Sequence, residues 1–528
     1  MRDFTHIELF AGCGGMNLGL ERAGYNLLFA NEISPMASET FAYNFFDENL
    51  LQLANEKLSP KNTLWIASEY TSENLKDRLR ENPFDGKKIY SDLTEDTDVN
   101  GKLLVGDIDR LHSFLLKNNK YAELRQMDID LVSGGPPCQS FSLAGKREKN
   151  NAKNLLPLSF AKFAGSVQPK VVLLENVKGI TAPFLENGEK YFAWLEVSKA
   201  FALEGYFPIC MMINSKYFGV PQNRPRFILM AYRKDIFLKL KKKIKNQQSE
   251  DIIENTLSFY NKVIDNKKSL DNVMISDLNY YDIESDSIFF NDILLPKPLT
   301  MKQNFVTVAS AIDDLSKKGV GNSIYISNVN NMFKSTKILN KALNFELRTH
   351  NIITQARFRF YQILEELPHN YKKELNSLLT EKESTLIINE VFDQIKKYKF
   401  IIPDKELQNI SDRKLRSSSE LINLITLLKT KKHSQRSLNR NQPAPAQLTI
   451  PDDICHYDFN SPRVLTVREM ARIQSFPDWF EFRSKVTTGG KMRKYETPQY
   501  TQVGNAVPPI LSMTLGKLVK NLLNKIEE

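Results

Sequence analysis

The sequence predicts an α/β domain with a mostly parallel sheet, interrupted by a second, smaller domain. Short apolar runs alternate with helical patterns over the first 232 residues, the composition changes over residues 233–435, and a compact pattern returns over residues 436–528. Alternating strands and helices are typical of parallel sheets, because each parallel pair needs a crossover connection. We therefore expect the first and last segments to share one domain and the middle segment to form the other.

Four apolar runs mark expected strands of this sheet: HIELF at 6–10, DIDLVS at 128–133, VVLLEN at 171–176 and RFILMAY at 226–232. Turn-rich strings follow the first three runs. Open sheets of this kind bind ligands at the carboxyl ends of their strands, so these strings are the candidate ligand-binding loops. Residues 47–100 break the rhythm, and we expect an insertion there.

The rest of the chain carries weaker signals. A lysine-rich run at 239–245 marks the expected domain boundary, and a more helical pattern extends over 300–430. NQPAPAQ at 441–447 is typical of a connector. Two helices are expected near the end, TVREMARIQSF at 466–476 and PPILSMTLGKLVKNLL at 508–523, the second opened by proline.

Composition limits the possible functions. With 528 residues, the chain is long enough for more than one hydrophobic core. A formal net charge of +10 favours a polyanionic partner, although a merely basic soluble protein would show it too. The four cysteines form no CxxC pair, which argues against a zinc site or a disulfide framework. We therefore expect no bound metal. No run of about 18 apolar residues occurs, so we expect a cytoplasmic protein without a membrane partner.

The string LFAGCGGMNLGL follows the first expected strand directly. Its Gly12, Gly14 and Gly15 would let the backbone approach a nucleotide-like ligand closely. The spacing is not GxGxxG, which disfavours a dinucleotide, and a tight turn without a ligand would also explain the string. Glu32 ends the next expected strand, where a carboxylate suits a ribose diol, although an isolated Glu is more often a surface residue.

A thiol, a carboxyl group and two arginines are expected at the same edge of the sheet. Cys138 lies in SGGPPCQSFS, where a proline-rich turn favours an exposed nucleophile over the usual buried cysteine. Glu175, followed by Asn176, ends a second strand and could protonate a heterocycle. QNRPRF places Arg224 and Arg226 at alternating strand positions and therefore on one face, although exposed arginines are equally common there.

In content and order these motifs resemble the cytosine-5 DNA methyltransferases, over about 1–45, 101–232 and 436–528. The resemblance implies a Rossmann-like, S-adenosylmethionine-dependent methyltransferase fold with a target-recognition domain in the middle segment. It implies methyl transfer from S-adenosylmethionine to carbon 5 of a flipped cytosine in double-stranded DNA. It further implies a monomer of a bacterial restriction-modification system, with a cognate restriction endonuclease that acts separately.

The resemblance also assigns roles to residues. It makes Cys138 the nucleophile, positioned by Pro137. Glu175, Arg226 and Arg224 would hold the cytosine, and Asn176 and Gln222 would support them. In the cofactor site, Phe10 would stack on adenine, Glu32 would bind the ribose hydroxyls and Asp107 the adenine amino group. The other cofactor positions are Ala11, Gly12, Gly14, Gly15, Ile33, Ile108, Asn505 and Val507.

The implied chemistry needs a thiolate, because carbon 5 of cytosine is a poor nucleophile until a nucleophile adds to carbon 6. Two further family motifs are similar to residues 463–480 and 502–509. The chain departs from the family after the catalytic loop, where NAKNLL at 151–156 replaces an Asp-x-Arg-Asn-x-x-Leu string. The insertion between Glu32 and Asp107 is also longer than in compact members.

Other functions compete with this hypothesis. A tRNA cytosine-5 methyltransferase would share the catalytic motifs, and a DNA-binding relative could have lost catalysis. The PPC string disfavours amino-group methyltransferases, and the glycine spacing disfavours a nicotinamide-dependent oxidoreductase. Basic and aromatic residues interleave at 348–361, within which an amphipathic helix begins, and basic residues recur at 429–440. Both segments are candidate DNA contacts, although a solvated helix face or linker explains them equally well.

Overall fold

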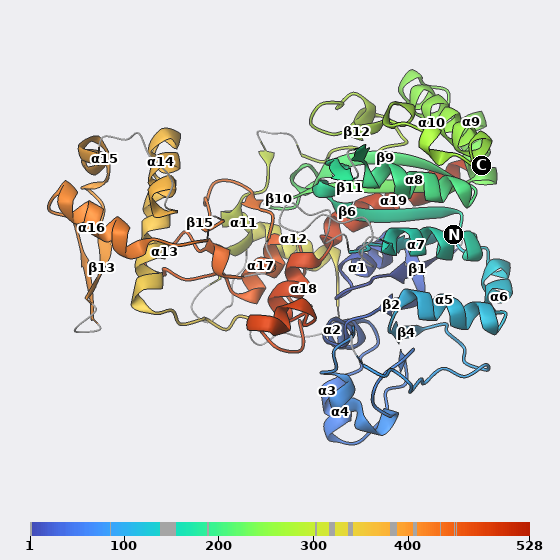
Figure 1. Cartoon of the computed structure of the whole chain (residues 1–528), viewed down its shortest axis with the longest axis horizontal. Helices are drawn as coiled ribbons and strands as arrows, with labels where there is room; N and C mark the ends of the chain where they lie inside the picture. The colour runs from blue at the N-terminus through green and yellow to red at the C-terminus, as the bar shows by residue number, and fades with distance from the viewer. Residues whose placement is uncertain are drawn as a thin grey trace.

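The computed structural model describes the chain except residues 1–2, 85, 138–154, 187–188, 301–303, 316–322, 336–341, 381–387, 405–408, 433, 448 and 450. Its main feature is a nine-stranded sheet (Figure 1). The strands lie in the order β12 (Tyr280–Asp282), β9 (Tyr206–Asn214), β11 (Pro225–Arg233), β6 (Val171–Val177), β5 (Leu131–Gly134), β1 (Phe4–Leu9), β2 (Tyr25–Glu32), β4 (Lys102–Val105) and β3 (Thr63–Trp65). Within this sheet, β11 alone is antiparallel to its neighbours, which confirms the predicted α/β fold with a mostly parallel sheet.

Helices cover both faces of the sheet. The chain moves one way across the sheet from β1 to β4 and the other way from β5 to β9, and right-handed crossovers then place the two sets of helices on opposite faces. The first set is α1 (Gly15–Ala23) and α2 (Pro35–Phe45). The second set is α5 (Ile108–Lys117), α6 (Lys120–Gln126), α7 (Leu156–Val167) and α8 (Ala193–Leu203). Because both faces are covered, the central strands are continuous buried apolar runs.

The C-terminal helix α19 (Pro509–Glu527) packs against α1 and so returns the end of the chain to the first domain. The two helices approach closely at glycine positions. A Cβ added at Gly19 would lie 2.4 Å from the carbonyl oxygen of Pro509, and one at Gly516 would lie 2.9 Å from the Cβ of Ala23. Ser512 Oγ also donates to the Met16 carbonyl at 2.7 Å. The last segment therefore completes the core of the α/β domain.

The insertion at 47–100 is an ordered unit at the β3 edge of the sheet. It contains α3 (Leu50–Asn55), β3, the 3₁₀ turn η1 (Ser72–Asn74) and α4 (Leu75–Arg78). Arg78 pairs with Asp92 at 2.7 Å, and Arg80 pairs with Glu39 of α2 at 3.0 Å. The first ion pair stabilises the insertion internally, and the second joins it to the sheet domain.

The α/β domain extends beyond the boundary that we expected at residue 232. Helices α9 (Lys234–Lys243) and α10 (Gln247–Asp265) and strand β12 share the core of the large sheet. The Phe207 ring of β9 stacks on Phe237 and on Tyr260, with centroids 4.3 and 3.9 Å apart. The lysine-rich run misleads because α9 is amphipathic: its lysines face outward while Phe237 and its apolar neighbours are buried.

A separate body lies at one end of the molecule, away from the sheet (Figure 1). Its core is built mainly by residues 356–428, with Cys455 and Val464. The elements are α13 (Ile352–Glu365), α14 (His369–Leu379), α15 (Ile388–Ile395), α16 (Ser418–Leu428) and the hairpin of β13 (Phe400–Asp404) and β14 (Asn409–Arg413). This outlying body is smaller than the middle segment 233–435, because part of that segment belongs to the sheet domain.

A further core, which lies between the sheet and the outlying body, contains residues from all parts of the chain. Its helices are α11 (Val308–Ile312), α12 (Ile324–Met332), α17 (Val467–Ile473) and α18 (Gln499–Asn505). The remaining short strands are β7 (Phe184–Glu186) with β8 (Glu189–Tyr191), β10 (Gln222–Asn223) with β16 (Ala444–Pro445), and β15 (Arg436–Ser437) with β17 (Ile454–Cys455). Short 3₁₀ turns are η3 (Lys178–Thr181), η4 (Ser215–Phe218), η5 (Leu270–Asn272), η6 (Ile275–Asp277), η7 (Phe289–Asn291), η9 (Pro451–Asp453) and η10 (Gly490–Lys494). None of the helices in the described part of the chain has the length and apolar character needed to cross a membrane.

Candidate active site

The register of the sheet brings the candidate loops to one edge. Leu9 of β1 pairs with Gly134 of β5, and Gly134 pairs with Leu174 of β6, so the residues that follow these three lie side by side. On the other side of β1, Glu32 pairs with Val105 of β4. The direction of the chain reverses between β1 and β5, which is where open sheets of this type bind ligands.

The glycine loop after β1 is tightly packed. Phe10 has a φ of 54°, and Gly14 has a φ of 90°, which a residue with a side chain rarely adopts. A Cβ at Gly14 would lie 2.2 Å from the ring of Phe45, and one at Gly15 would lie 2.5 Å from the carbonyl oxygen of Val507. The last motif thus lies directly against the loop, with Val507 buried and Asn505 exposed at the end of α18.

Glu32 is buried beside this loop and is held by backbone donors. Its two carboxylate oxygens accept hydrogen bonds of 2.8 Å from the N–H groups of Gly12 and Ser34. Burial raises the pKa of the Glu32 carboxyl, and these N–H groups oppose the shift. Ala11 donates to the carbonyl of Asn31 at 3.0 Å. These backbone donors hold the Glu32 carboxylate in one orientation beside the glycine loop.

Asp107 begins α5 as its N-cap residue. Its Oδ1 accepts from the N–H groups of Asp109 and Arg110, at 2.9 and 3.2 Å. A pocket of about 230 Å³ opens beside it, and Ile33 and Gly106 line the same pocket. Ile108, in contrast, is buried in the core of the sheet domain. Of the three expected cofactor positions Ile33, Asp107 and Ile108, the first two line this cavity.

Glu175 and Arg226 form a buried ion pair across β6 and β11. Arg226 Nε lies 2.8 Å from Glu175 Oε1, and the two side chains are 11% and 10% exposed. Burial lowers the pKa of Arg226, and the carboxylate of Glu175 opposes that shift. Arg226 Nη1 also donates to the carbonyl of Pro225 at 2.8 Å. The pair is therefore fixed at the ends of β6 and β11, at the same edge of the sheet as the candidate loops.

Two contacts connect this pair to the loop that leads to the candidate nucleophile. Asn176 Nδ2 donates to the carbonyl of Pro136 at 3.0 Å. A Cβ at Gly135 would lie 3.1 Å from Glu175 Oε2, so the carboxylate lies over the loop backbone. Pro137 is exposed and is the last residue described before a gap, so Cys138 lies outside the described residues. Most of the departing NAKNLL string, residues 151–154, lies outside them too.

Arg224 differs from the role that the resemblance implies. It is 1% exposed, and its Nη2 donates to the carbonyls of Gly504 and Ala506 at 2.9 and 3.0 Å. Gln222 lies beside it and accepts from the N–H of Gln447 at 3.2 Å. In the part of the chain that the structure describes, Arg224 thus connects β11 to the last motif, and Arg226 alone of the two arginines pairs with Glu175.

We expect Arg224→Met to lower the thermal stability and to raise the KM for the methyl donor with little change in kcat. The substitution leaves two buried carbonyls without a donor, at about 1–3 kcal/mol each, and releases the Val507 segment from the glycine loop. Differential scanning calorimetry and steady-state kinetics measure the two effects. Arg22→Met on the exposed side of α1 is the matched control, and equal behaviour of the two variants would contradict the assignment.

Sequence reasoning missed Asn214, which supports the start of β11. Its Oδ1 accepts from the N–H of Arg224 at 2.9 Å, and its Nδ2 donates to Asn223 Oδ1 at 2.7 Å. The one available signal is that it is the polar residue ending the apolar strand YFPICMMIN.

The motif at 463–480 organises the neighbouring core, where Arg472 pairs with Asp478 at 2.8 Å and with Asp314 at 2.7 Å.

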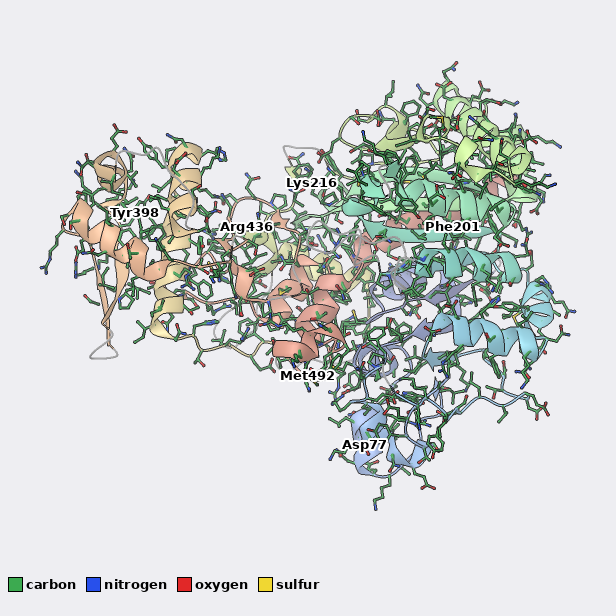
Figure 2. The ribbon with its side chains drawn as sticks, in the orientation of Figure 1. Asp77, Phe201, Lys216, Tyr398, Arg436 and Met492 are labelled. Atoms are coloured by element: carbon green, nitrogen blue, oxygen red, sulfur yellow. The ribbon has the colours of Figure 1, made fainter. Side chains whose placement is uncertain are left out.

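The arginines of α13 are used within the outlying body. Arg357 Nε donates to the carbonyl of Leu428 at 2.9 Å, and Arg359 pairs with Asp412 at 3.2 Å. Their candidate role as DNA contacts is therefore not supported by their positions, because α13 is a core helix. Arg436, in contrast, is exposed and lies where the outlying body meets the rest of the molecule, while Tyr398 lies within the outlying body (Figure 2).

Comparison with known proteins gives a consistent result. The family model of C-5 cytosine-specific DNA methylases matches residues 4–63 and 99–521. The type II methyltransferase M.DdeI of Desulfomicrobium norvegicum is 23% identical over 527 residues, covering 98% of this chain and 90% of the relative. M.XorII of Xanthomonas oryzae pv. oryzae is 24% identical over 524 residues, covering 99% and 86%.

A shorter and closer match is the type II methyltransferase M.NgoPII of Neisseria gonorrhoeae, which is 30% identical over 234 residues, covering 44% of this chain and 49% of the relative. Among solved structures, the Dnmt2 methyltransferase of S. pombe is 14% identical over 99% of both chains, with a TM-score of 0.40. At that distance the structural likeness adds nothing to the assignment. Because the family model spans most of the sequence, the chain belongs to the C-5 cytosine-specific DNA methylase family.

Proposed function

We propose that this enzyme uses S-adenosylmethionine to methylate carbon 5 of a cytosine that is flipped out of duplex DNA. The observation that carries the proposal is the Glu175–Arg226 ion pair, held over the loop that leads to Cys138. We further propose that the enzyme acts as a monomer in a restriction-modification system beside a separate endonuclease. The names of its type II methyltransferase relatives support that context.

The residues of the glycine loop fit S-adenosylmethionine. The buried Glu32 carboxylate, held by two backbone donors, suits the hydroxyls of a ribose. The pocket at Ile33 and Asp107 suits a base with an amino group, because Asp107 Oδ1 is occupied and the second oxygen makes no hydrogen bond to a residue that the structure describes. When bound, S-adenosylmethionine supplies an electrophilic methyl group on a sulfonium sulfur. Phe10, Asn505 and Val507 complete the proposed site.

The protein residues act on the cytosine. Base flipping brings the ring to the sheet edge at a cost of a few kcal/mol. The thiolate of Cys138 adds to carbon 6, while Glu175 donates a proton to N3 and Arg226 stabilises the charge that develops on the ring. Carbon 5 then carries enamine character and takes the methyl group, and S-adenosylhomocysteine is the leaving group. A base removes the proton from carbon 5, the carbon–sulfur bond breaks, N3 returns its proton to Glu175, and the thiolate is regenerated.

The substrate and its sequence can be tested directly. Purified enzyme, tritiated S-adenosylmethionine and equal amounts of duplex DNA or tRNA give the class of substrate, and bisulfite sequencing of DNA from an expressing host gives the methylated site. We expect label in DNA alone, at one cytosine of a short repeated sequence. Label in tRNA would overturn the DNA assignment. No label in either substrate would support the alternative that the chain is a DNA-binding relative that has lost catalysis.

We expect the outlying body to determine which sequence is methylated. Exchange of residues 352–428 with the corresponding segment of M.DdeI should change the methylated sequence, because base-edge contacts are worth about 1–3 kcal/mol each and depend on individual side chains. Bisulfite sequencing measures the outcome. Exchange of α9 and α10, residues 234–265, is the control and should leave the target unchanged; an unchanged target in both chimaeras would place sequence reading elsewhere.

A further inference from the structure

The insertion contributes one wall of the pocket at Asp107. The opposite wall consists of strand-end positions that the family motifs share, Ile33, Val105, Gly106 and Asp107. The insertion side consists of Ala67, Glu81, Pro83, Phe84, Gly86 and Lys88. The family model matches this chain up to residue 63 and again from residue 99, so the whole second wall lies in the unmatched segment. The family resemblance therefore assigns nothing to these residues.

This wall is held in place by contacts of one buried carboxylate. Glu81 Oε2 accepts from Ser68 Oγ at 2.8 Å and from the N–H of Glu69 at 3.1 Å, and Glu81 Oε1 pairs with Lys88 at 3.3 Å. The Glu81 side chain is 2% exposed. Arg110 of α5 donates from Nη1 to the carbonyl of Lys88 at 3.1 Å and so connects the wall to the sheet domain. The insertion wall is thus preorganised against Asp107.

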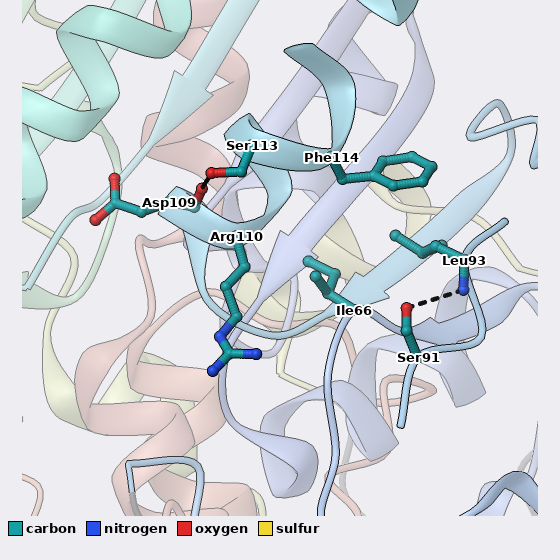
Figure 3. Close-up of a pocket in the computed structure, with 7 residues that line it drawn as sticks. All are labelled: Ile66, Ser91, Leu93, Asp109, Arg110, Ser113 and Phe114. Atoms are coloured by element: carbon teal, nitrogen blue, oxygen red, sulfur yellow. Dashed lines mark hydrogen bonds between the residues drawn. The ribbon is translucent and has the colours of Figure 1, made fainter. Parts of the chain in front are cut away.

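The chemistry of the two walls suits a flat heteroaromatic ring with an amino group. Phe84 lines the pocket from the insertion side and is 53% exposed. Ile33 supplies an apolar surface from the strand-end wall, and Asp107 supplies an acceptor for the amino group. A neighbouring pocket of about 330 Å³ shares Arg110 but is lined by Ile66, Leu93 and Phe114, and none of the strand-end positions reaches it (Figure 3).

We propose that the insertion residues that line this pocket form the outer wall of the adenine subsite and that the Phe84 ring covers the adenine of S-adenosylmethionine. This inference rests on the proposed function, which places the adenine at Asp107. Stacking of a base on an aromatic side chain is a substantial and geometrically tolerant contribution to binding. Phe84 is thus a residue that sets the affinity for the methyl donor without taking part in methyl transfer.

The test is the affinity of the full-length enzyme for S-adenosylhomocysteine, measured by isothermal titration calorimetry. We expect Phe84→Ala to raise the Kd about 10-fold and to raise the KM for S-adenosylmethionine similarly, with kcat at saturating donor unchanged. Phe84→Tyr should keep wild-type affinity. Ile89→Ala is the matched control, because Ile89 lies in the same insertion, is 72% exposed and does not line the pocket. Equal melting temperatures of the variants exclude unfolding as the cause.

A further variant separates this inference from the proposed function. Glu32→Ala should weaken S-adenosylhomocysteine binding at least as much as Phe84→Ala does. If Glu32→Ala weakens binding and Phe84→Ala does not, the insertion wall plays no part in the adenine subsite while the cofactor site stands. If Glu32→Ala binds as wild type does, the proposed cofactor site itself is wrong.

Discussion

Replacing Cys138 by serine should reduce methyl transfer by at least ~10³-fold, equivalent to about 4 kcal/mol of activation free energy, while DNA affinity stays at the wild-type value. A thiol forms a thiolate near neutral pH and is an intrinsically strong nucleophile, whereas a serine hydroxyl without an activating base is not. Without addition to carbon 6, carbon 5 cannot take the methyl group. Tritium transfer to DNA and fluorescence anisotropy with a labelled duplex measure the two quantities.

The other cysteines provide the control for this variant. Cys13, Cys210 and Cys455 are buried, and burial raises the pKa of each thiol to about 12. These thiols are therefore protonated at neutral pH, and Cys210→Ala on β9 should retain activity.

DNA in which the target cytosine carries fluorine at carbon 5 should form a complex with the wild type that survives denaturing electrophoresis, because the final proton removal is blocked. Turnover of Cys138→Ser within about 10-fold of wild type would rule out covalent catalysis, since activation by a positioned nucleophile contributes more than that.

The fold could be predicted from sequence because its central strands are buried on both faces. Strands β5, β6 and β11 are continuous apolar runs, and each ends or begins with a polar string. In a parallel sheet such ends meet at one edge, which is why the approach of Glu175 to Gly135 could be expected from residues far apart in sequence. The geometry of the sheet, rather than any single motif, makes the position of this part of the site predictable from the sequence.

What could not be predicted depends on contacts between distant segments. The amphipathic helix α9 resembles a basic linker until the sheet supplies a surface for Phe237. Arg224 and Arg359 are the kind of residue that contacts an anionic ligand. In the structure, however, Arg224 donates to backbone carbonyls and Arg359 pairs with Asp412. The insertion wall at Phe84 carries no pattern of its own. Hydrogen-bond partners across such distances are set by packing, and one sequence alone does not reveal them.

The second large effect is expected for Glu175→Gln, which should lower the rate of methyl transfer by about 10²–10⁴-fold. In the wild type, Arg226 Nε lies 2.8 Å from Glu175 Oε1, and the amide of the variant retains an oxygen that can accept this hydrogen bond. The amide cannot, however, donate an acidic proton to N3 of the cytosine. Binding of DNA and of S-adenosylhomocysteine should stay close to wild type. Single-turnover methylation at saturating donor measures the chemical step alone. Glu196→Gln on α8, which removes a carboxylate paired with Lys199 at 2.8 Å, is the matched control.

Whether Arg226 acts on the cytosine or only through the acid can be decided by combining substitutions. If Arg226 serves only to hold Glu175, Arg226→Lys should slow the wild type but add little to Glu175→Gln, so the two effects would not be additive. If Arg226 stabilises the charge on the ring directly, the double variant should be slower than the wild type by nearly the product of both single effects. A rate for Glu175→Gln within about fivefold of wild type would be too small for general acid catalysis and would remove Glu175 from the mechanism.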